Sequence, residues 1–459
     1  ADRFWCISFD VARERSTAMN RRQPKTPRVS RRRFLTTSAA AVTAVGVHSE
    51  LSARIADAPS ERINIAAVGA AGRNAANIRG TSTQNIVAMA DIDADNLGKG
   101  SVAHPNVRKY RDFRMMLEKE ADRIDAVVIG TPDHIHAPAA AMALRLKKHV
   151  YCEKPLTHTV FEARTLRELA QKNKLVTQMG TQIHSGDNYR RVVELIESGA
   201  IGEIRDVHVW SNAVYTGAKF TTGATPPAHV DWDLWLGPAP QRPYSEGVHP
   251  FQWRKFWDYG TGCLGDFGCH YMDLAHWALG LTHPTDIRAI GPKFDPVSCP
   301  PWLVVHYKYP KRGKLPPVNL TWYDSGRRPE LLKSLRLKDG KSVDLAAGQL
   351  FIGSDGMILS NYSMHKMFRD GKHVDFTPPK QSIPKSIGHH QEWLHAIKTG
   401  GSTTCNFNYS GALAEAVLLG TVAYRSGEAL QWDAEQLKVT NSSSAQQWVH
   451  KEYRKGWTL

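Results

Sequence analysis

The sequence predicts an α/β protein that begins with a doubly wound parallel sheet. Near-continuous apolar runs, typical of strands buried on both faces, recur at 63–68, 85–90 and 124–129. Helical stretches separate these runs, and a glycine-containing turn follows the first of them. The chain has 459 residues, of which 42% are hydrophobic and 22% charged, so it is long enough for two or three folded domains.

The turn after the first strand is suited to a dinucleotide. A helix begins after Gly69 and Gly72, so its free backbone N–H groups and its dipole can bind a pyrophosphate. The spacing departs from the usual three-glycine fingerprint, because Ala71 replaces the second glycine, Gly72 comes one place late and Asn74 takes the third position. We predict that five residues of this turn contact the cofactor: Gly69, Ala71, Gly72, Arg73 and Asn74.

Asp91 ends the second strand, 22 residues after Gly69. A carboxylate at this distance can accept hydrogen bonds from both ribose hydroxyls of NAD and repels a 2′-phosphate. The sequence therefore predicts NAD in preference to NADP. The alternative is a carboxylate that only caps the turn before Asp93 and Asp95.

The third strand leads into a stretch with two histidines, and an alanine-rich helix is predicted over 137–146. Ligands of such sheets bind at the carboxyl ends of the strands, so Thr131, Pro132 and His136 are predicted to line the cofactor from a loop. The spacing of His134 and His136 would also suit zinc, but no third ligand lies nearby in the sequence. The six cysteines are irregularly spaced as well, and we predict no metal site.

Glu153, Lys154 and Pro155 follow a fourth strand at 149–152. This tripeptide, downstream of a nucleotide-binding strand and turn, resembles the signature of the Gfo/Idh/MocA oxidoreductases, the family of glucose-fructose oxidoreductase and inositol dehydrogenase. The resemblance extends through 180–202 and 262–273 to the C-terminal stretch, and so covers about residues 61–459.

The resemblance implies an NAD(P)-dependent oxidoreductase that acts on a hydroxyl group of a sugar, a polyol or a related carbohydrate. It implies a Rossmann-type domain over 61–183 and a substrate-binding α+β domain over 184–459. The second domain would contain a large open, mainly antiparallel sheet, and its C-terminal helices would pack back on the first domain. Some relatives are NAD-dependent glycosidases that use transient oxidation and elimination, and this function remains the alternative.

The segment 262–273 begins a helix with one polar face. Four side chains recur at i, i+4, i+7 and i+11 and so share that face: Asp266, His270, Asp273 and Trp277. Such a face is a poor core and should line a wet cleft. We expect Asp266 to cap the start of the helix, to fix the tautomer of His270 and to raise its basicity. The alternatives are a simple cap with a core histidine, or a metal site that also uses His276.

Lys154, His270 and Asp266 are the predicted catalytic residues. Hydride transfer from a secondary alcohol needs a base for the hydroxyl proton, and we assign this role to His270. Lys154, held near the nicotinamide by Glu153 and Pro155, would stabilise negative charge on the reacting oxygen. The equivalent lysine transfers protons in some family members, so the division of roles between Lys154 and His270 stays open.

The second half supplies the predicted substrate contacts, which are His184, Arg190, Arg254 and Asp273. Five tryptophans precede Asp266 and could stack on sugar rings or anchor the core: Trp210, Trp232, Trp235, Trp253 and Trp257.

Residues 1–60 are predicted to form an export leader. They carry 11 basic and 5 acidic side chains, a net charge of +6, within a chain whose net charge is +15. Three arginines at 31–33 precede an uncharged, weakly apolar stretch, which resembles a twin-arginine signal. We expect translation to start at Met19 and removal of roughly the first 50 to 60 residues.

The remaining net charge of +9 is spread over 61–459 and gives no argument for nucleic-acid binding. We expect a carbohydrate-like substrate, the twin-arginine export machinery and further copies of the chain as partners, without nucleic acid or stable membrane insertion after processing. The predicted location is periplasmic or extracytoplasmic. Because no NAD pool recycles the cofactor there, we expect NAD to be bound tightly before export.

Overall fold

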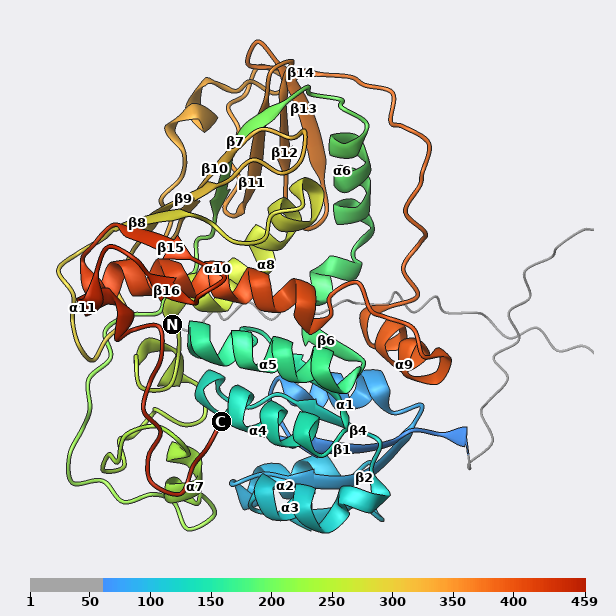
Figure 1. Ribbon diagram of the computed structural model, residues 1–459, viewed down its shortest axis with the longest axis vertical. Helices are drawn as coiled ribbons and strands as arrows, with labels where there is room; N and C mark the ends of the chain where they lie inside the picture. Colours follow the sequence, from blue (N-terminus) through green and yellow to red (C-terminus); the bar gives the residue numbers. More distant parts are fainter. Residues whose placement is uncertain (1–60) are drawn as a thin grey trace, which may run out of the picture. The chain divides into compact units, whose positions relative to one another are not determined.

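The first sheet is parallel throughout and has the strand order β3-β2-β1-β4-β5-β6 (Figure 1). The computed structural model describes residues 61–459, and the predicted leader lies outside the described residues. The strands are β1 (Asn64–Val68), β2 (Asn85–Ala90), β3 (Arg108–Tyr110), β4 (Ala126–Ile129), β5 (His149–Glu153) and β6 (Thr177–Gly180).

Helices cover both faces of this sheet, because successive residues of each strand point in opposite directions. Ala66 and Val68 of β1 join the hydrophobic cluster that contains residues of α3, α4 and α5, whereas Ile65 and Ala67 join the cluster that contains residues of α1 and α2. These helices are α1 (Asn74–Thr81), α2 (Ala94–Ser101), α3 (Phe113–Glu120), α4 (Asp133–Arg145) and α5 (Val160–Asn173). The predicted doubly wound sheet is confirmed.

The second sheet is mainly antiparallel and has the order β14-β13-β12-β11-β7-β10-β9-β8-β15-β16, in which only β7 and β10 pair in parallel. This result confirms the predicted fold class. The strands are β7 (Ile204–Trp210), β8 (Asp286–Ile290), β9 (Val304–Tyr309), β10 (Val318–Tyr323), β11 (Gly348–Gly353), β12 (Met357–Ser360), β13 (His365–Arg369), β14 (Lys372–Val374), β15 (Leu430–Asp433) and β16 (Lys438–Val439).

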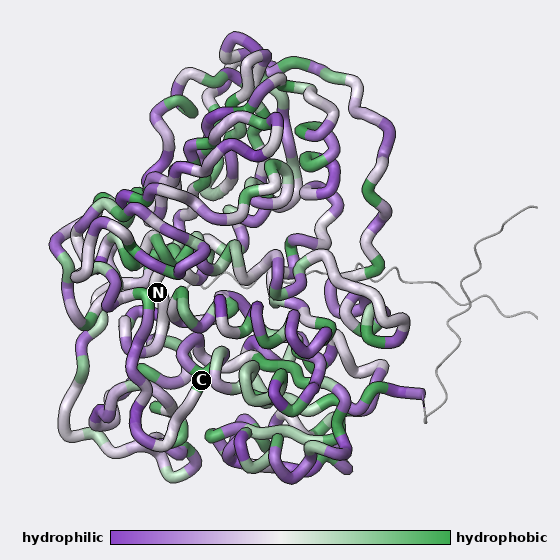
Figure 2. The backbone as a smooth tube through the Cα atoms, viewed as in Figure 1, coloured by the Kyte–Doolittle hydropathy of each residue, from purple (hydrophilic) through white to green (hydrophobic). Residues whose placement is uncertain are grey.

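Two long helices connect the sheets. Helix α8 (Gly262–Leu279) packs on β7 and β11, and α10 (Phe407–Ser426) packs on both α8 and α5. Hydrophobic stretches run along α10 in the middle of the described part (Figure 2). Arg164 of α5 donates two hydrogen bonds to the buried carboxylate of Glu415 on α10, at 2.9 and 2.8 Å, which fixes the register of the two helices. Among residues 61–459, no helix is both long and apolar enough to cross a membrane.

The remaining helices are shorter. Helix α9 (His389–Thr399) packs against α1, and α6 (Asp187–Glu197) packs against α8. Single turns complete the chain: η3 (Ala121–Arg123), η4 (Gln182–Ser185), α7 (Trp232–Leu236), η5 (Gln252–Lys255), η6 (Glu330–Ser334) and α11 (Ser443–Gln446).

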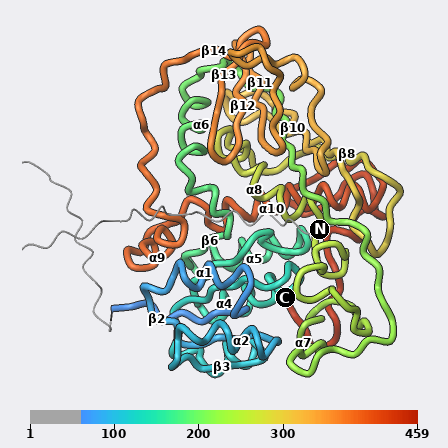
Figure 3. Tube along the Cα trace, turned by 180° about the vertical axis from the view of Figure 1, so that it is seen from behind, coloured from blue at the N-terminus to red at the C-terminus, as the bar shows by residue number. Residues whose placement is uncertain are grey.

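A long connection, 211–261, joins β7 to α8 and runs beside the parallel sheet (Figure 3). It contains its own aromatic cluster, to which Trp232, Trp235 and Trp253 belong. Trp210 and Trp257 belong to two other clusters, so the five tryptophans do not form one surface. We call residues 229–254 of this connection the roof, because they lie over the cavity described next.

Candidate cofactor and active site

A cavity opens at the carboxyl ends of β1, β2 and β4, where the doubly wound topology predicts a ligand. Its lining includes seven of the predicted cofactor contacts: Gly69, Ala71, Gly72, Arg73, Asp91, Thr131 and Pro132. The roof closes the other side with Leu234, Trp235, His249, Pro250, Trp253 and Arg254. Asn74, His136, Glu153 and Lys154 do not belong to this lining.

The β1–α1 turn requires its glycines for two different reasons. A side chain at Gly69 would lie 3.0 Å from the carbonyl oxygen of Gly130, so two strands approach closely there. Gly72 has a φ of +57°, in the left-handed region. The turn that precedes α1 lines the cavity, so the N-terminus of the helix faces it, which fits the phosphates of a dinucleotide.

Asn74 lies beneath this turn, where it is fully buried. Its amide nitrogen donates to the carbonyl oxygens of Val68 at 3.1 Å and Gly69 at 2.6 Å. The prediction that Asn74 contacts the cofactor is therefore corrected, because both donors of its side chain amide face the protein backbone. Asn74 takes the place of the third glycine because Gly130 of the neighbouring strand leaves room for it.

Asp91 both lines the cavity and holds the turn. One carboxylate oxygen accepts from the backbone nitrogen of Ala70 at 2.8 Å, and the other accepts from that of Asp93 at 3.0 Å. Burial raises the pKa of Asp91. Asp91 therefore caps the turn, as the alternative predicted. Its hydrogen bonds to the ribose hydroxyls of NAD stay a prediction.

Lys154 follows β5 and forms an ion pair with Asp266 of α8. Its ammonium group also donates to the backbone carbonyl of Asp266 at 3.2 Å. Burial alone would raise the pKa of Asp266, but the charges of Lys154 and Arg254 outweigh burial and lower that pKa. The helix begins after Thr261, so Asp266 lies in its second turn, and the prediction that Asp266 caps the helix is wrong.

His270 lies one turn after Asp266 on the helix, but the carboxylate of Asp266 bonds to Lys154 instead of to His270. Its Nδ1 atom is buried and has no hydrogen-bond partner in the described part of the chain. Burial and the charge of Lys154 lower the pKa of His270 to about 3. The charge of Asp266 does raise the pKa of His270, as expected, but burial and Lys154 outweigh this effect, so the imidazole is neutral at physiological pH.

Glu153 holds the loop that carries Lys154 in place through buried hydrogen bonds. The buried carboxylate accepts hydrogen bonds from Arg73 at 3.1 Å, Asn77 at 2.9 Å and Gln182 at 2.8 Å. These donors come from the turn before α1, from α1 and from η4. Glu153 therefore links the cofactor turn to the position of Lys154, without lining the cavity itself.

His136 supports the same loop from the other side. It lies in the first turn of α4, not in a loop, because that helix begins at Asp133 rather than at 137. Its ring nitrogens lie 2.7 Å from the carbonyl oxygen of Pro155 and 2.8 Å from that of Thr131. The ring is buried between two backbone segments. The prediction that His136 contacts the cofactor is therefore corrected: the side chain positions the loop that carries Lys154. The ring nitrogens of His134 likewise face carbonyl oxygens.

Asp133 is a buried acid beside the Lys154–Asp266 pair that sequence reasoning missed. It is 2% exposed and accepts a hydrogen bond from the hydroxyl of Thr261 at 2.8 Å. Burial and the charge of Asp266 raise the pKa of Asp133 to about 7. No local pattern indicates this, because the groups that raise the pKa are more than a hundred residues away in sequence.

Replacing Asp133 with asparagine should change the pH dependence of stability. The folded pKa of about 7 exceeds the ordinary 3.8, so the wild-type protein loses stability from this group as the pH rises between these values. The free energy of unfolding of the wild type, relative to Asp133→Asn, should fall by about 4 kcal/mol from pH 4 to pH 8. Urea unfolding at several pH values measures the difference. The exposed Asp122→Asn is the control, and parallel pH profiles for wild type and Asp133→Asn would contradict the result.

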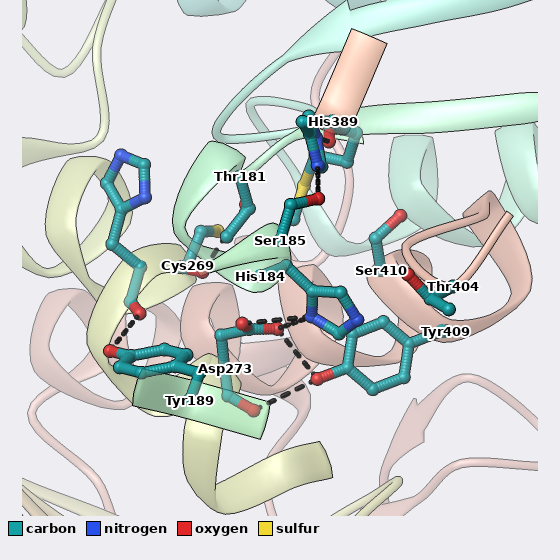
Figure 4. A network of polar contacts seen from close by, with 12 residues as sticks. Thr181, His184, Ser185, Tyr189, Cys269, Asp273, His389, Thr404, Tyr409 and Ser410 are labelled. Atoms are coloured by element: carbon teal, nitrogen blue, oxygen red, sulfur yellow. Dashed lines mark hydrogen bonds and ion pairs between the residues drawn. The ribbon is translucent and has the colours of Figure 1, made fainter. Parts of the chain in front are cut away.

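In the far half of the predicted polar face, Asp273 joins a network of polar contacts, which Figure 4 shows. Asp273 is fully buried, lies 2.9 Å from Nδ1 of His184 and accepts from the hydroxyl of Tyr409 at 2.7 Å. The ring of His184 stacks on Trp277 with centroids 4.1 Å apart. The helix face therefore does not line a wet cleft along its whole length.

The prediction that His184, Arg190 and Asp273 contact the substrate is therefore corrected. Arg190 is 6% exposed and donates to the carbonyl oxygen of Pro384 at 3.0 Å. All three side chains have partners in the second domain, which sequence spacing does not show, although Nε2 of His184 and Nε of Arg190 are buried without a hydrogen-bond partner in the described part of the chain. Arg254 differs from them, because it lines the cavity and lowers the pKa of Asp266.

Two models of protein families match the chain. One, described as an oxidoreductase family with an NAD-binding Rossmann fold, matches residues 63–181. The other, described as the C-terminal alpha/beta domain of an oxidoreductase family, matches residues 188–315. Both models are named for Gfo/Idh/MocA. The two matches fall on the two sheets described above.

Individual proteins show the same likeness. Inositol 2-dehydrogenase of Rubrobacter xylanophilus is 30% identical over 148 residues, which are 31% of this chain and 42% of that protein. The chain spans about half the length of the first curated relatives it matches.

Solved structures are similar over more of the chain. Aldose-aldose oxidoreductase from Caulobacter crescentus, complexed with glycerol, has a TM-score of 0.55 and 17% identity, over 81% of this chain and 100% of that one. The WlbA dehydrogenase from Bordetella pertussis, in complex with NADH and UDP-GlcNAcA, has a TM-score of 0.56 and 16% identity, over 81% of this chain and 99% of that one. At these identities the likeness is one of fold.

Proposed function

The chain belongs to the Gfo/Idh/MocA family of oxidoreductases with an NAD-binding Rossmann fold, and from this premise we propose that it oxidises a hydroxyl group of a sugar or polyol with NAD. The observation that carries the proposal is the buried Lys154–Asp266 ion pair. Arg254 connects the pair to the cavity, because it lines the cavity and lowers the pKa of Asp266. A charged ammonium group beside a nucleotide site can stabilise an oxygen that gains negative charge.

The residues of the chain would divide the reaction as follows. When bound, NAD accepts the hydride that leaves the carbinol carbon, while the hydroxyl proton leaves the oxygen and a carbonyl group forms. Lys154 donates a hydrogen bond to that oxygen, and Asp266 orients the ammonium group. His270 is neutral and can accept the proton, but its low pKa makes it a weak base. In this proposal Lys154 therefore has the larger share of the catalysis.

The hydrogen bonds of the roof support the proposal that the cofactor is bound tightly. The backbone nitrogen of Asp231 donates to the carbonyl oxygen of Ile92 at 3.0 Å, and that of Ala94 donates to the carbonyl oxygen of His229 at 2.9 Å. The Nε2 atom of His249 lies 3.0 Å from the carboxylate of Asp93. The roof is therefore bonded to the loop after β2, next to Asp91, and in this proposal these bonds slow the release of the nucleotide.

Tight binding of NAD agrees with the proposed export of the protein. The arginines at 31–33 support twin-arginine export, which carries folded proteins, to a periplasmic or extracytoplasmic location. NAD bound inside the cell would then leave with the protein. In this proposal a second carbonyl compound would have to take up the two electrons, since no free cofactor is exchanged. We also retain homo-oligomers as part of the proposal.

Replacing His249 with alanine should speed the release of NAD. Loss of the hydrogen bond to Asp93 removes about 1.5 kcal/mol from the closed roof, which corresponds to a roughly tenfold higher dissociation rate. Rapid dilution into a nucleotide scavenger, followed by protein fluorescence, measures the rate. The exposed His395→Ala is the matched control, and equal rates in both variants and the wild type would show that the roof does not retain NAD.

Product analysis tests the proposed function. Protein purified with its cofactor is incubated with a panel of sugars, polyols and glycosides, and the products are identified by mass spectrometry. A keto product that has lost two hydrogens supports the oxidoreductase. Release of an aglycone without net oxidation supports the alternative, an NAD-dependent glycosidase, which the closed roof also favours because its cofactor is restored in each cycle. Absence of any product across the panel would overturn both.

A further inference from the structure

Five aromatic side chains form a row beside the Lys154–Asp266 pair: Tyr362, Tyr271, Phe267, Tyr215 and Phe251. Successive ring centroids lie 4.6, 6.4, 6.2 and 6.5 Å apart in this order. The first four rings are close to parallel, with interplanar angles of 13°, 25° and 24°, and Phe251 is tilted by 66°. The row draws on α8, on the 211–261 connection and on the turn after β12, and it contains none of the predicted tryptophans.

Lys154 lies beside the middle of the row. Its ammonium nitrogen is 5.7 Å from the ring centre of Phe267. Tyr271 and Tyr362 therefore extend from the reaction centre in one direction, and Tyr215 and Phe251 extend in the other. Burial and the charge of Asp266 raise the pKa of Tyr215, which is consistent with a position next to the ion pair.

The row passes from the interior to the surface. Tyr271 is 9% exposed, Phe267 and Tyr215 are half-buried, and Phe251 is 48% exposed. Phe251 is a large apolar ring that the fold leaves open to water, two rings away from Phe267 and the charged group beside it. Such a combination of ring faces and central polar groups matches a carbohydrate, whose apolar ring faces stack on aromatic rings and whose hydroxyls need hydrogen bonds.

The outer rings are held in place before any ligand arrives. The hydroxyl of Thr216 donates to the carbonyl oxygen of Cys299 at 2.8 Å, and the backbone nitrogen of Ala218 donates to the hydroxyl of Ser298 at 3.0 Å. The guanidinium group of Arg254 lies 4.6 Å from the ring centre of Phe251. Because the rings need little ordering, binding to them loses little entropy.

We propose that Tyr215 and Phe251 bind a further sugar unit beside the unit that reacts, so that the substrate is an oligosaccharide rather than a free monosaccharide. A monosaccharide would need only the surroundings of Lys154, whereas Tyr215 and the exposed Phe251 continue the row beyond them toward water. The inference rests on the proposed function for the location of the reaction centre, and it adds the size and class of the substrate.

Binding and turnover are measured separately to test this proposal. Full-length protein with its NAD is titrated calorimetrically with mono-, di- and trisaccharides of glucose, galactose, mannose and N-acetylglucosamine. In at least one series we expect the affinity to rise tenfold or more from the monosaccharide to the disaccharide. Phe251→Ala should lower the affinity for that disaccharide about tenfold, and Leu315→Ala, which removes an exposed apolar side chain from the β9–β10 turn, should leave it unchanged.

The outcomes separate the two proposals. Affinity that does not depend on length in any series, or an unchanged affinity in Phe251→Ala, would overturn the oligosaccharide site even if monosaccharides are oxidised. Length-dependent binding that Phe251→Ala weakens supports the site, even if no bound sugar is oxidised and the proposed function fails. Phe251 is exposed, so its replacement should leave the fold intact, which a circular dichroism melt verifies.

Discussion

Lys154→Met should lower kcat/KM for the proposed oxidation by at least about 1,000-fold, because it removes the charge that stabilises the reacting oxygen. Methionine keeps the length and apolar stem of the side chain, so the loss reports on the ammonium group. The NAD content after purification should stay near that of the wild type, since Lys154 does not belong to the lining of the cofactor cavity. Steady-state rates on the best substrate of the panel, with nucleotide released by denaturation, measure both quantities.

The single variant also leaves the buried carboxylate of Asp266 without its partner, which costs stability. Lys154→Met combined with Asp266→Asn removes both charges and is therefore the control for folding. We expect the double variant to melt at a higher temperature than Lys154→Met and to be equally inactive. Activity within tenfold of the wild type in either variant would remove Lys154 from the reaction.

Asp273→Ala should lower the free energy of unfolding by about 3–5 kcal/mol, because it leaves buried polar partners unpaired. The carboxylate is fully buried and bonds both His184 and Tyr409, so its loss affects the contact between η4, α8 and α10. Urea unfolding measures this effect. Asp273→Asn keeps an acceptor for Tyr409 and should lose only about 1–2 kcal/mol.

The same variants decide between a structural role and the substrate contact that the sequence predicted. If Asp273 is structural, Asp273→Asn should retain the KM of the wild type for the proposed substrate. A tenfold higher KM with stability close to that of the wild type would restore Asp273 as a substrate contact. Both results are measured on Asp273→Asn, so the test does not require Asp273→Ala to fold.

The positions of the cofactor turn and of Lys154 could be predicted because they depend on local sequence. A strand buried on both faces must be apolar along its length, and β1, β4 and β5 show this pattern before the turns that carry the predicted cofactor residues. The periodicity of α8 also placed Asp266, His270 and Asp273 on one helix correctly. It could not show how deeply each is buried, since burial depends on elements that pack against the helix.

The sequence by itself determined the two-domain α/β architecture, the nucleotide turn and the residues that stand at the ends of the parallel strands. Only the tertiary structure decided which polar groups meet. Asp266 pairs with Lys154 rather than with His270, Asp273 pairs with His184, and Asp133 lies close enough to Asp266 for its pKa to rise. These partners are separated by 89 to 133 positions in the chain. They meet because α8 packs on β7, β11 and η4, which brings its side chains to His184 and to Lys154 after β5. Charge and pKa follow from burial and from such distant neighbours, and neither is present in a local pattern.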